Sequence, residues 1–133
     1  MLNRKDYLLR QIQQLIDAII MKFTSIELEE KLYDPEEIGD LYLKYFQENR
    51  KYFIEKPSAE IITLLYKNTS PENALAKMEI LAELLYGEGK ILQDKSMIQK
   101  ATKLLEYNLQ ESGVFDMQKI KRLRKMKENL QLM

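Results

Sequence analysis

The chain has 133 residues, of which 45% are hydrophobic and 32% are charged. This composition is too apolar for a disordered chain, and the length suits a single helical domain, residues 1–133, with a core of its own. Because 21 acidic side chains balance 21 basic ones, the molecule as a whole has no bulk electrostatic attraction to nucleic acid or to an anionic membrane.

Cysteine and histidine are both absent from the chain. Without them a disulfide, a thiolate metal site, a Ser-His or Cys-His triad and a helical di-metal site built on Glu-x-x-His pairs cannot form. Asp34, Glu36 and Gly39 follow the first half of a calcium-loop pattern. However, Pro35 contradicts a loop at this point, and Tyr45 stands where the bidentate glutamate should be. We expect no catalytic activity, no cofactor and no metal ion.

The distribution of apolar residues bears on the location of the protein. The longest apolar run, residues 18–21, is four residues long, whereas a membrane-spanning helix needs about 20. The first residues lead into an amphipathic pattern without the apolar core of a signal peptide. We expect a cytoplasmic protein that does not interact with a membrane.

Apolar residues at helical spacing predict a first helix from about Asp6 to Phe23. They form two neighbouring rows, Leu8, Ile12, Leu15, Ile19 and Leu9, Ile16, Ile20, Phe23. Two adjacent rows make a stripe wider than a surface helix needs. Either the chain covers this stripe from two sides, or part of it forms a homodimer interface through Leu9, Ile16 or Ile20.

Start signals divide the rest of the chain into five further helices. The residues expected to begin them are, in chain order, Asp34, Ser58, Ser70, Asp94 or Ser96, and Asp116. The helix after Asp34 should continue until Pro57 interrupts it, and Gly113 fits the end of the fifth helix. No segment alternates as a strand would. The predicted fold class is all-α, with about six helices packed as antiparallel hairpins.

Residues 82–113 follow the pattern of a helical repeat. Its large apolar, small and closing positions are occupied by Leu85, Gly89, Leu92, Ala101 and Leu105. The stretch resembles a tetratricopeptide repeat, although Glu88 replaces an apolar residue, Asn108 a small one and Gly113 the closing proline. The resemblance implies a right-handed array of helical hairpins, with one unit at about 71–113 and a groove for a protein segment.

Two end segments carry a second resemblance. They read DYLLRQIQQL at 6–15 and SGVFDMQKIKRLRKM at 112–126. Together with the Leu-Leu-Tyr helix between them, they resemble an uncharacterised family of small all-helical bacterial proteins. This resemblance implies the fold and the cytoplasmic location, and it implies no activity.

The repeat-like register also predicts a partner-binding surface. The residues on the groove-facing side of the unit's first helix are Glu83, Tyr86, Lys90 and Gln93. One aromatic side chain among polar neighbours is typical of a peptide-binding groove. In this register Gly89 packs closely inside a long helix; in the alternative, Gly87 and Gly89 mark a helix terminus. We expect a non-catalytic module that binds a protein or peptide partner.

The last predicted helix is strongly basic. Its basic residues are Lys119, Lys121, Arg122, Arg124, Lys125 and Lys127. Three interpretations stay open: a solvated helix that closes the array, a face for an acidic protein partner, or a phosphate-binding face for nucleic acid, carried by Lys119, Arg122, Arg124 and Lys125. No aromatic residue follows Phe115, so the helix offers no stacking platform for single-stranded bases.

Overall fold

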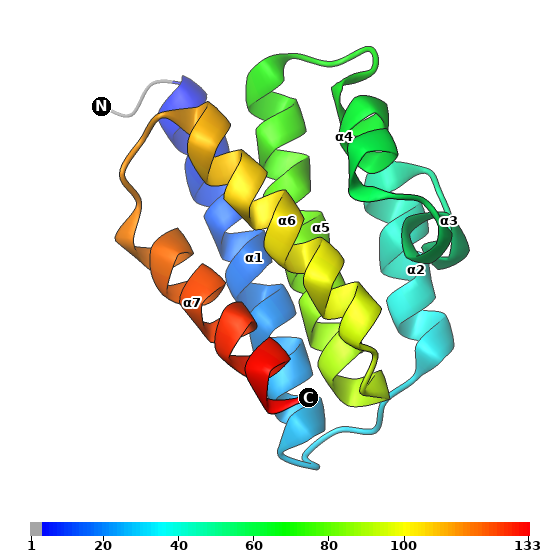
Figure 1. Cartoon of the computed structure of the whole chain (residues 1–133). Helices are drawn as coiled ribbons and strands as arrows, with labels where there is room; N and C mark the ends of the chain where they lie inside the picture. The colour runs from blue at the N-terminus through cyan, green and yellow to red at the C-terminus, as the bar shows by residue number, and fades with distance from the viewer. Residues whose placement is uncertain (1–3) are drawn as a thin grey trace.

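The computed structural model describes the backbone of residues 4–133 and the side chains from residue 7 onward. Within this part the chain forms seven helices and no strand, which confirms the all-α class (Figure 1). The helices are α1 (Arg4–Glu27), α2 (Pro35–Phe46), α3 (Arg50–Glu55), α4 (Ser58–Tyr66), α5 (Pro71–Leu92), α6 (Lys95–Ser112) and α7 (Met117–Leu132). None of these described helices combines the length and the apolar character that crossing a bilayer requires.

Side-chain caps begin four of the helices as the sequence predicts. The caps are Asp34, Ser70, Asp94 and Asp116, each accepting a hydrogen bond from a backbone N–H in the first turn. Gly113 ends α6 in the left-handed conformation, with φ of 63°. The prediction for Ser58 was wrong, because Pro57 occupies the cap position of α4 and Ser58 is the first helical residue.

The predicted second helix is in fact two helices, which raises the number to seven. Gln47 adopts a left-handed conformation after α2, and the side chain of Asn49 accepts a hydrogen bond from the backbone N–H of Tyr52 to start α3. The break lets Phe53 turn back onto α2. Its ring centroid lies 5.4 Å from that of Phe46 and 6.0 Å from that of Tyr42, so the interruption gains aromatic packing that a continuous helix would not reach.

Helices α5 and α6 form an antiparallel hairpin in the middle of the molecule. In Figure 1, α1 and α7 lie on one side of this hairpin and α2 to α4 on the other. Leu85, Ala101 and Leu105 are all buried in the core of the hairpin, as their spacing predicts. Helices α5 and α6 thus contribute most of the buried core residues, and the other five helices pack around them.

Both glycines near the end of α5 lie inside a continuous helix. A Cβ atom on Gly89 would lie 2.9 Å from Cγ1 of Ile98, which confirms the close packing expected at this position. A Cβ atom on Gly87 would lie 2.1 Å from the ring of Phe23 on α1. The lack of a side chain at Gly87 therefore lets the ring of Phe23 pack directly against α5, a contact that the sequence did not predict.

The apolar stripe of α1 is covered increasingly from its start to its end, with Ile12 and Leu15 half-buried against the core. Ile16, Ile19 and Phe23 are buried against the hairpin, whereas Leu8 and Leu9 near the start of the helix are 44% and 55% exposed. Ile16 is therefore excluded as a contact with a second subunit, because its own chain covers it. For Leu9 and for the half-buried Ile20, a homodimer contact stays a prediction.

Candidate functional site

A series of cavities runs along α5, between α1 and α7. Their volumes are about 290, 110 and 610 Å³. The first and the second share Ile20, Glu83 and Arg122 in their walls, and the second and the third share Glu27 and Lys90. These shared residues show that the three cavities adjoin in a row, and we call this row the α1–α7 groove.

The structure brings the four residues of the predicted partner-binding surface into this groove. Glu83 lines the first two cavities, Tyr86 the second, Lys90 the second and third, and Gln93 the third. Lys90 and Gln93 are accessible from outside, but Glu83 and Tyr86 are only 4% and 1% exposed. The surface predicted to be free for a partner is thus partly occupied by α7 of the same chain.

The widest apolar part of the groove is the first cavity. Its apolar wall consists of Ile16, Ile20 and Leu105, contributed by α1 and α6. Polar side chains surround this wall, among them Asp17, which accepts a hydrogen bond of 2.9 Å from the amide of Gln13. Ile16 and Leu105 are only 2% and 1% exposed, so the half-buried Ile20 is the part of this wall that an apolar side chain of a partner can reach.

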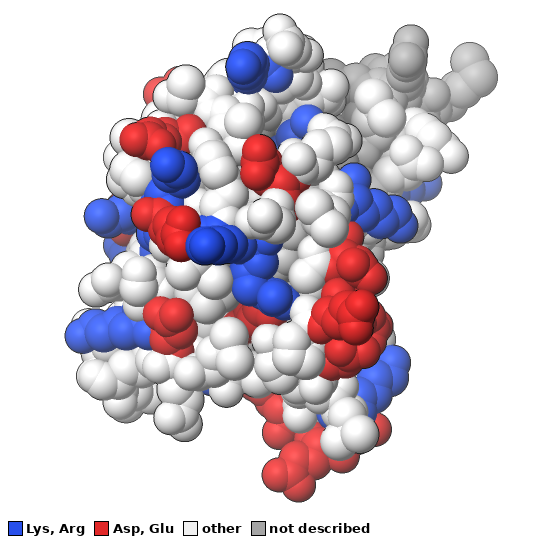
Figure 2. Space-filling view, turned by 90° about the vertical axis from the view of Figure 1, so that its right-hand side faces the viewer, with Lys and Arg blue, Asp and Glu red and all other residues white. Residues whose placement is uncertain are grey.

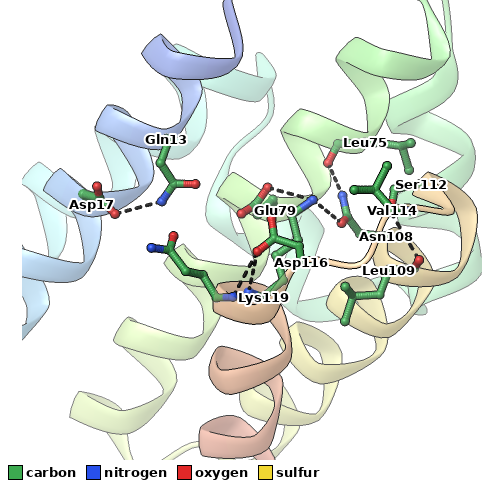
Figure 3. Close-up of polar contacts among 11 residues, drawn as sticks. Gln13, Asp17, Leu75, Glu79, Asn108, Leu109, Ser112, Val114, Asp116 and Lys119 are labelled. Atoms are coloured by element: carbon green, nitrogen blue, oxygen red, sulfur yellow. Dashed lines mark hydrogen bonds and ion pairs between the residues drawn. The ribbon is translucent and has the colours of Figure 1, made fainter. Parts of the chain in front are cut away.

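Helix α7 is attached to α5 through charged and polar side chains. Arg122 donates two hydrogen bonds to the carboxylate of Glu83, of 2.9 Å from Nε and 2.7 Å from Nη2. Lys119 lies 3.5 Å from the carboxylate of Glu79 and donates a 3.0 Å hydrogen bond to the side-chain oxygen of Asn108 (Figure 3). Such two-pronged pairing of a guanidinium with a carboxylate fixes orientation as well as distance.

Tyr86 extends this polar attachment further along α5. Its hydroxyl accepts a hydrogen bond of 2.5 Å from the side-chain amide of Asn129. Cationic groups of Lys90 and Arg122 lie 4.4 and 5.4 Å from the centre of its ring. Burial raises the pKa of Tyr86 to about 12, so the hydroxyl is protonated at neutral pH and holds its place in the network as a neutral group.

Burial also affects the carboxylate at the other end of the contact. It raises the pKa of Glu79, while the nearby Lys119 acts in the opposite direction. Glu79 opens toward the first cavity. A carboxylate that is poorly hydrated and bound to one distant ammonium group is a good receptor for a closer cation.

The predicted basic residues of α7 divide into two groups. Lys119 and Arg122 face α5 and are half-buried, whereas Arg124 and Lys125 are exposed. Lys127 pairs with Glu106 of α6 at 3.0 Å. Helix α7 is therefore not simply a solvated terminal helix, because half of its predicted basic residues form the ion pairs that attach it to the hairpin.

The acidic segment 27–40 is not the partner of the α7 bases. Acidic side chains gather on the lower part of the face that carries α2 to α4, with basic ones spread among them (Figure 2). Among the described residues, the ion pairs of this segment join Glu27 to Lys90 and Glu37 to Lys22. The basic residues of α7 instead pair with acids of the central hairpin.

A second buried carboxylate lies outside the groove, on the opposite face of α5. Glu88 is completely buried and receives a hydrogen bond of 2.8 Å from Arg50 Nε. The hydroxyl groups of Tyr33 and Tyr42 donate to the same carboxylate at 2.6 and 3.0 Å. This network explains how α5 accommodates an acid where the repeat pattern has an apolar residue, and it leaves no room for a ligand.

No family model matches the chain, and neither a curated protein nor a solved structure shows a significant match to it. The likeness to a tetratricopeptide repeat and to small bacterial helical proteins therefore stays a prediction drawn from residues. Within the described residues, no three carboxylates come close enough together to hold a metal ion.

Proposed function

We propose that this protein is a non-catalytic interaction module that binds a segment of a partner protein along the α1–α7 groove. The observation that carries the proposal is the row of three adjoining cavities, with the half-buried Ile20 in its apolar wall and charged side chains on both sides. Apolar pockets within a polar border are the usual chemistry of protein recognition.

The finer architecture belongs to the same proposal. We take the α5–α6 hairpin as a tetratricopeptide-like unit and α7 as the first helix of an incomplete following unit, with the protein acting in the cytoplasm. In such arrays the concave side of the first helices binds extended or helical segments. Glu83, Tyr86, Lys90 and Gln93 are the residues of α5 that this arrangement would present to a partner.

The experiment uses the absence of cysteine from the chain. A single cysteine at the exposed groove residue Asp17 carries a photo-crosslinker, and the matched control carries it at Lys103, which is exposed on α6 outside the groove. We expect the same discrete protein to be crosslinked from Asp17→Cys and not from Lys103→Cys, in lysate treated with nuclease. Equal labelling from both positions would contradict binding in the groove.

The alternative function is association with nucleic acid through α7. Lys121, Arg124 and Lys125 are exposed within little more than one helical turn, and among the described residues they form no ion pair. Phosphate contacts release counterions, so binding of short RNA or duplex DNA should weaken steeply as salt rises. A fluorescence titration that finds no binding of the parent chain at low salt ends this alternative. If the parent chain binds, Lys121→Glu should weaken the binding.

A further inference from the structure

The side of α7 that meets α5 has a defined chemical pattern. Its contact residues are Lys119, Arg122, Met126 and Asn129, at the spacing of one helical face. The facing residues of α5 are Glu79, Glu83 and Tyr86, which also share one face, and we call these three residues the acidic seat. A row of two bases, one apolar residue and one amide thus lies on a row of two acids and one hydroxyl.

The contact of α7 with α5 is mainly polar. Elsewhere α7 packs mainly against α6, and its side chains Leu123 and Leu130 lie half-buried against the core. Within α7, all of which the structure describes, Met126 is the one fully buried side chain. Buried or half-buried ion pairs contribute little net stability, because removing two charges from water offsets most of their attraction. They do impose orientation and selectivity. The acidic seat therefore selects a basic helix without holding it strongly.

The segment that joins α7 to the hairpin is short and loosely packed. It begins at Gly113, in the left-handed conformation, and Val114 and Phe115 are 65% and 76% exposed. The linker itself adds little to the attachment of α7, because its apolar side chains are not packed into the core. Release of α7 would expose Met126 and the half-buried Leu123 and Leu130 together with the acidic seat.

From these observations we propose that the acidic seat is an exchangeable binding site whose ligand is a basic amphipathic helix of a partner protein, which takes the place of α7. The proposal rests on the proposed function and specifies the chemistry of the partner. The partner helix carries a base, a second base three positions later, an apolar residue four positions after that and a side-chain amide three positions further on. In the free chain, α7 fills the seat itself.

The chemistry of the seat excludes other classes of helix. A helix without a cation opposite Glu83 would leave a carboxylate that is 4% exposed without its partner, so such a helix binds less well than a basic one. An acidic helix would add repulsion from Glu79. The same two carboxylates that make the contact weak thus make it selective for a basic partner.

The test uses the full chain and a fluorescent peptide with the sequence of residues 114–133. In the parent chain the attached α7 competes at an effective concentration in the millimolar range, so the added peptide should bind weakly. Arg122→Glu places an acid against Glu83 and releases α7. We expect the peptide to bind this variant about tenfold more tightly than the parent, as measured by fluorescence anisotropy.

Matched variants make the result specific. Arg124→Glu introduces the same charge change at an exposed position of α7 and should bind the peptide no better than the parent does. Met126→Ala loosens α7 without any charge change and should also improve peptide binding, which keeps the test valid if Arg122→Glu fails to fold. A peptide that itself carries Arg122→Glu should not bind the Arg122→Glu chain.

Two outcomes would overturn the exchangeable seat. One is that neither Arg122→Glu nor Met126→Ala binds the parent peptide more tightly than the parent chain does. The other is that the charge-reversed peptide binds as well as the parent peptide. Either result would leave the crosslinking result from Asp17 unaffected, so failure of this inference is distinguishable from failure of the proposed function.

Discussion

The two faces of α5 hold buried carboxylates in different ways. On one face, Glu88 is fully buried and receives hydrogen bonds from Arg50, Tyr33 and Tyr42 within an aromatic cluster. On the other face, Glu83 is bound by Arg122 alone, and cavities lie on either side of it. The first arrangement is a completed polar core, whereas the second holds a helix next to open space. This difference is why the proposed exchange is assigned to the groove side of α5.

The largest expected effect comes from the closed face. Arg50→Ala would leave the carboxylate of Glu88 buried with hydroxyl donors only, and breaking a buried pair in this way typically costs about 3–5 kcal/mol. We expect the free energy of unfolding in urea to fall by about 3 kcal/mol, the lower value, because the guanidinium of Arg50 is itself partly exposed.

The neighbouring Lys51 provides the control for this measurement. Its pair with Glu55 spans 3.8 Å, and both side chains are mostly exposed. Lys51→Ala should therefore leave stability within about 0.5 kcal/mol of the parent. Equal effects of Arg50→Ala and Lys51→Ala would mean that the network at Glu88 is not a closed core.

The second prediction concerns the contact between α1 and α5 at the groove. Gly87→Ala would place a methyl group inside the ring position of Phe23, and the required movement of α1 should lower the free energy of unfolding by about 1–3 kcal/mol. Gly39→Ala is the matched control, because its methyl group would meet the guanidinium of Arg50 at an ordinary 3.5 Å. There the gain in helix propensity should stabilise the chain by up to about 1 kcal/mol.

A double variant sharpens the second prediction. Phe23→Ala removes the ring that the new methyl group would meet, so the cost of Gly87→Ala should largely disappear in that background. Thermal denaturation of the four chains of this cycle measures the coupling. Strictly additive effects would show that the close approach of Phe23 and Gly87 is not the point of contact.

The third prediction concerns the stability of the network around Glu88 at high pH. Burial, followed by the charge of Glu88, raises the pKa of Tyr42, and burial raises that of Tyr33 as well. The folded chain then keeps these protons at a pH where the unfolded chain, with tyrosine pKa values near 10, begins to lose them. The retained protons contribute their full stabilisation of the folded chain below about pH 10. Above that pH the free energy of unfolding falls, by at most about 1.4 kcal/mol per pH unit for each tyrosine.

The pH dependence can be assigned to one side chain. Tyr42→Phe cannot ionise, so its stability should fall less steeply above about pH 10 than that of the parent chain, although it starts lower for lack of one hydrogen bond to Glu88. Urea titrations at several pH values give the two slopes. Parallel slopes would contradict the role of Tyr42 in this network.

Local signals made much of the fold predictable. Asp34, Ser70, Asp94 and Asp116 begin helices because a short side-chain acceptor at the first turn satisfies free N–H groups, a rule that depends on few residues. The break between α2 and α3 was missed, since apolar spacing continues through it and Gln47 is not a usual left-handed residue.

The candidate site was predictable in one respect only. Helical spacing places Glu83, Tyr86 and Lys90 on one face of α5, and this face does line the groove. Which helix would cover it depends on the path of residues 113–116, and local spacing does not specify that path. The pattern of Lys119, Arg122 and Met126 on one face of α7 was a usable signal, because bases in line with an apolar residue indicate docking against buried acids.

The smallest expected effect lies on the open face and is local. Arg122→Ala removes the cation that holds Glu83, but water can reach the freed carboxylate through the cavities beside it, so the cost should be only about 1–2 kcal/mol. Because Met126 is the one fully buried side chain of α7, this loss should appear as local opening of the helix more than as lower global stability. Amide hydrogen exchange in α7 should then accelerate by about five- to thirtyfold, while exchange in α2 stays at the parent rate. Arg124→Ala, exposed on the same helix, should leave both rates unchanged. If exchange accelerates equally in α2 and α7, the two faces of α5 open together, and the distinction between a closed core and an exchangeable seat does not hold.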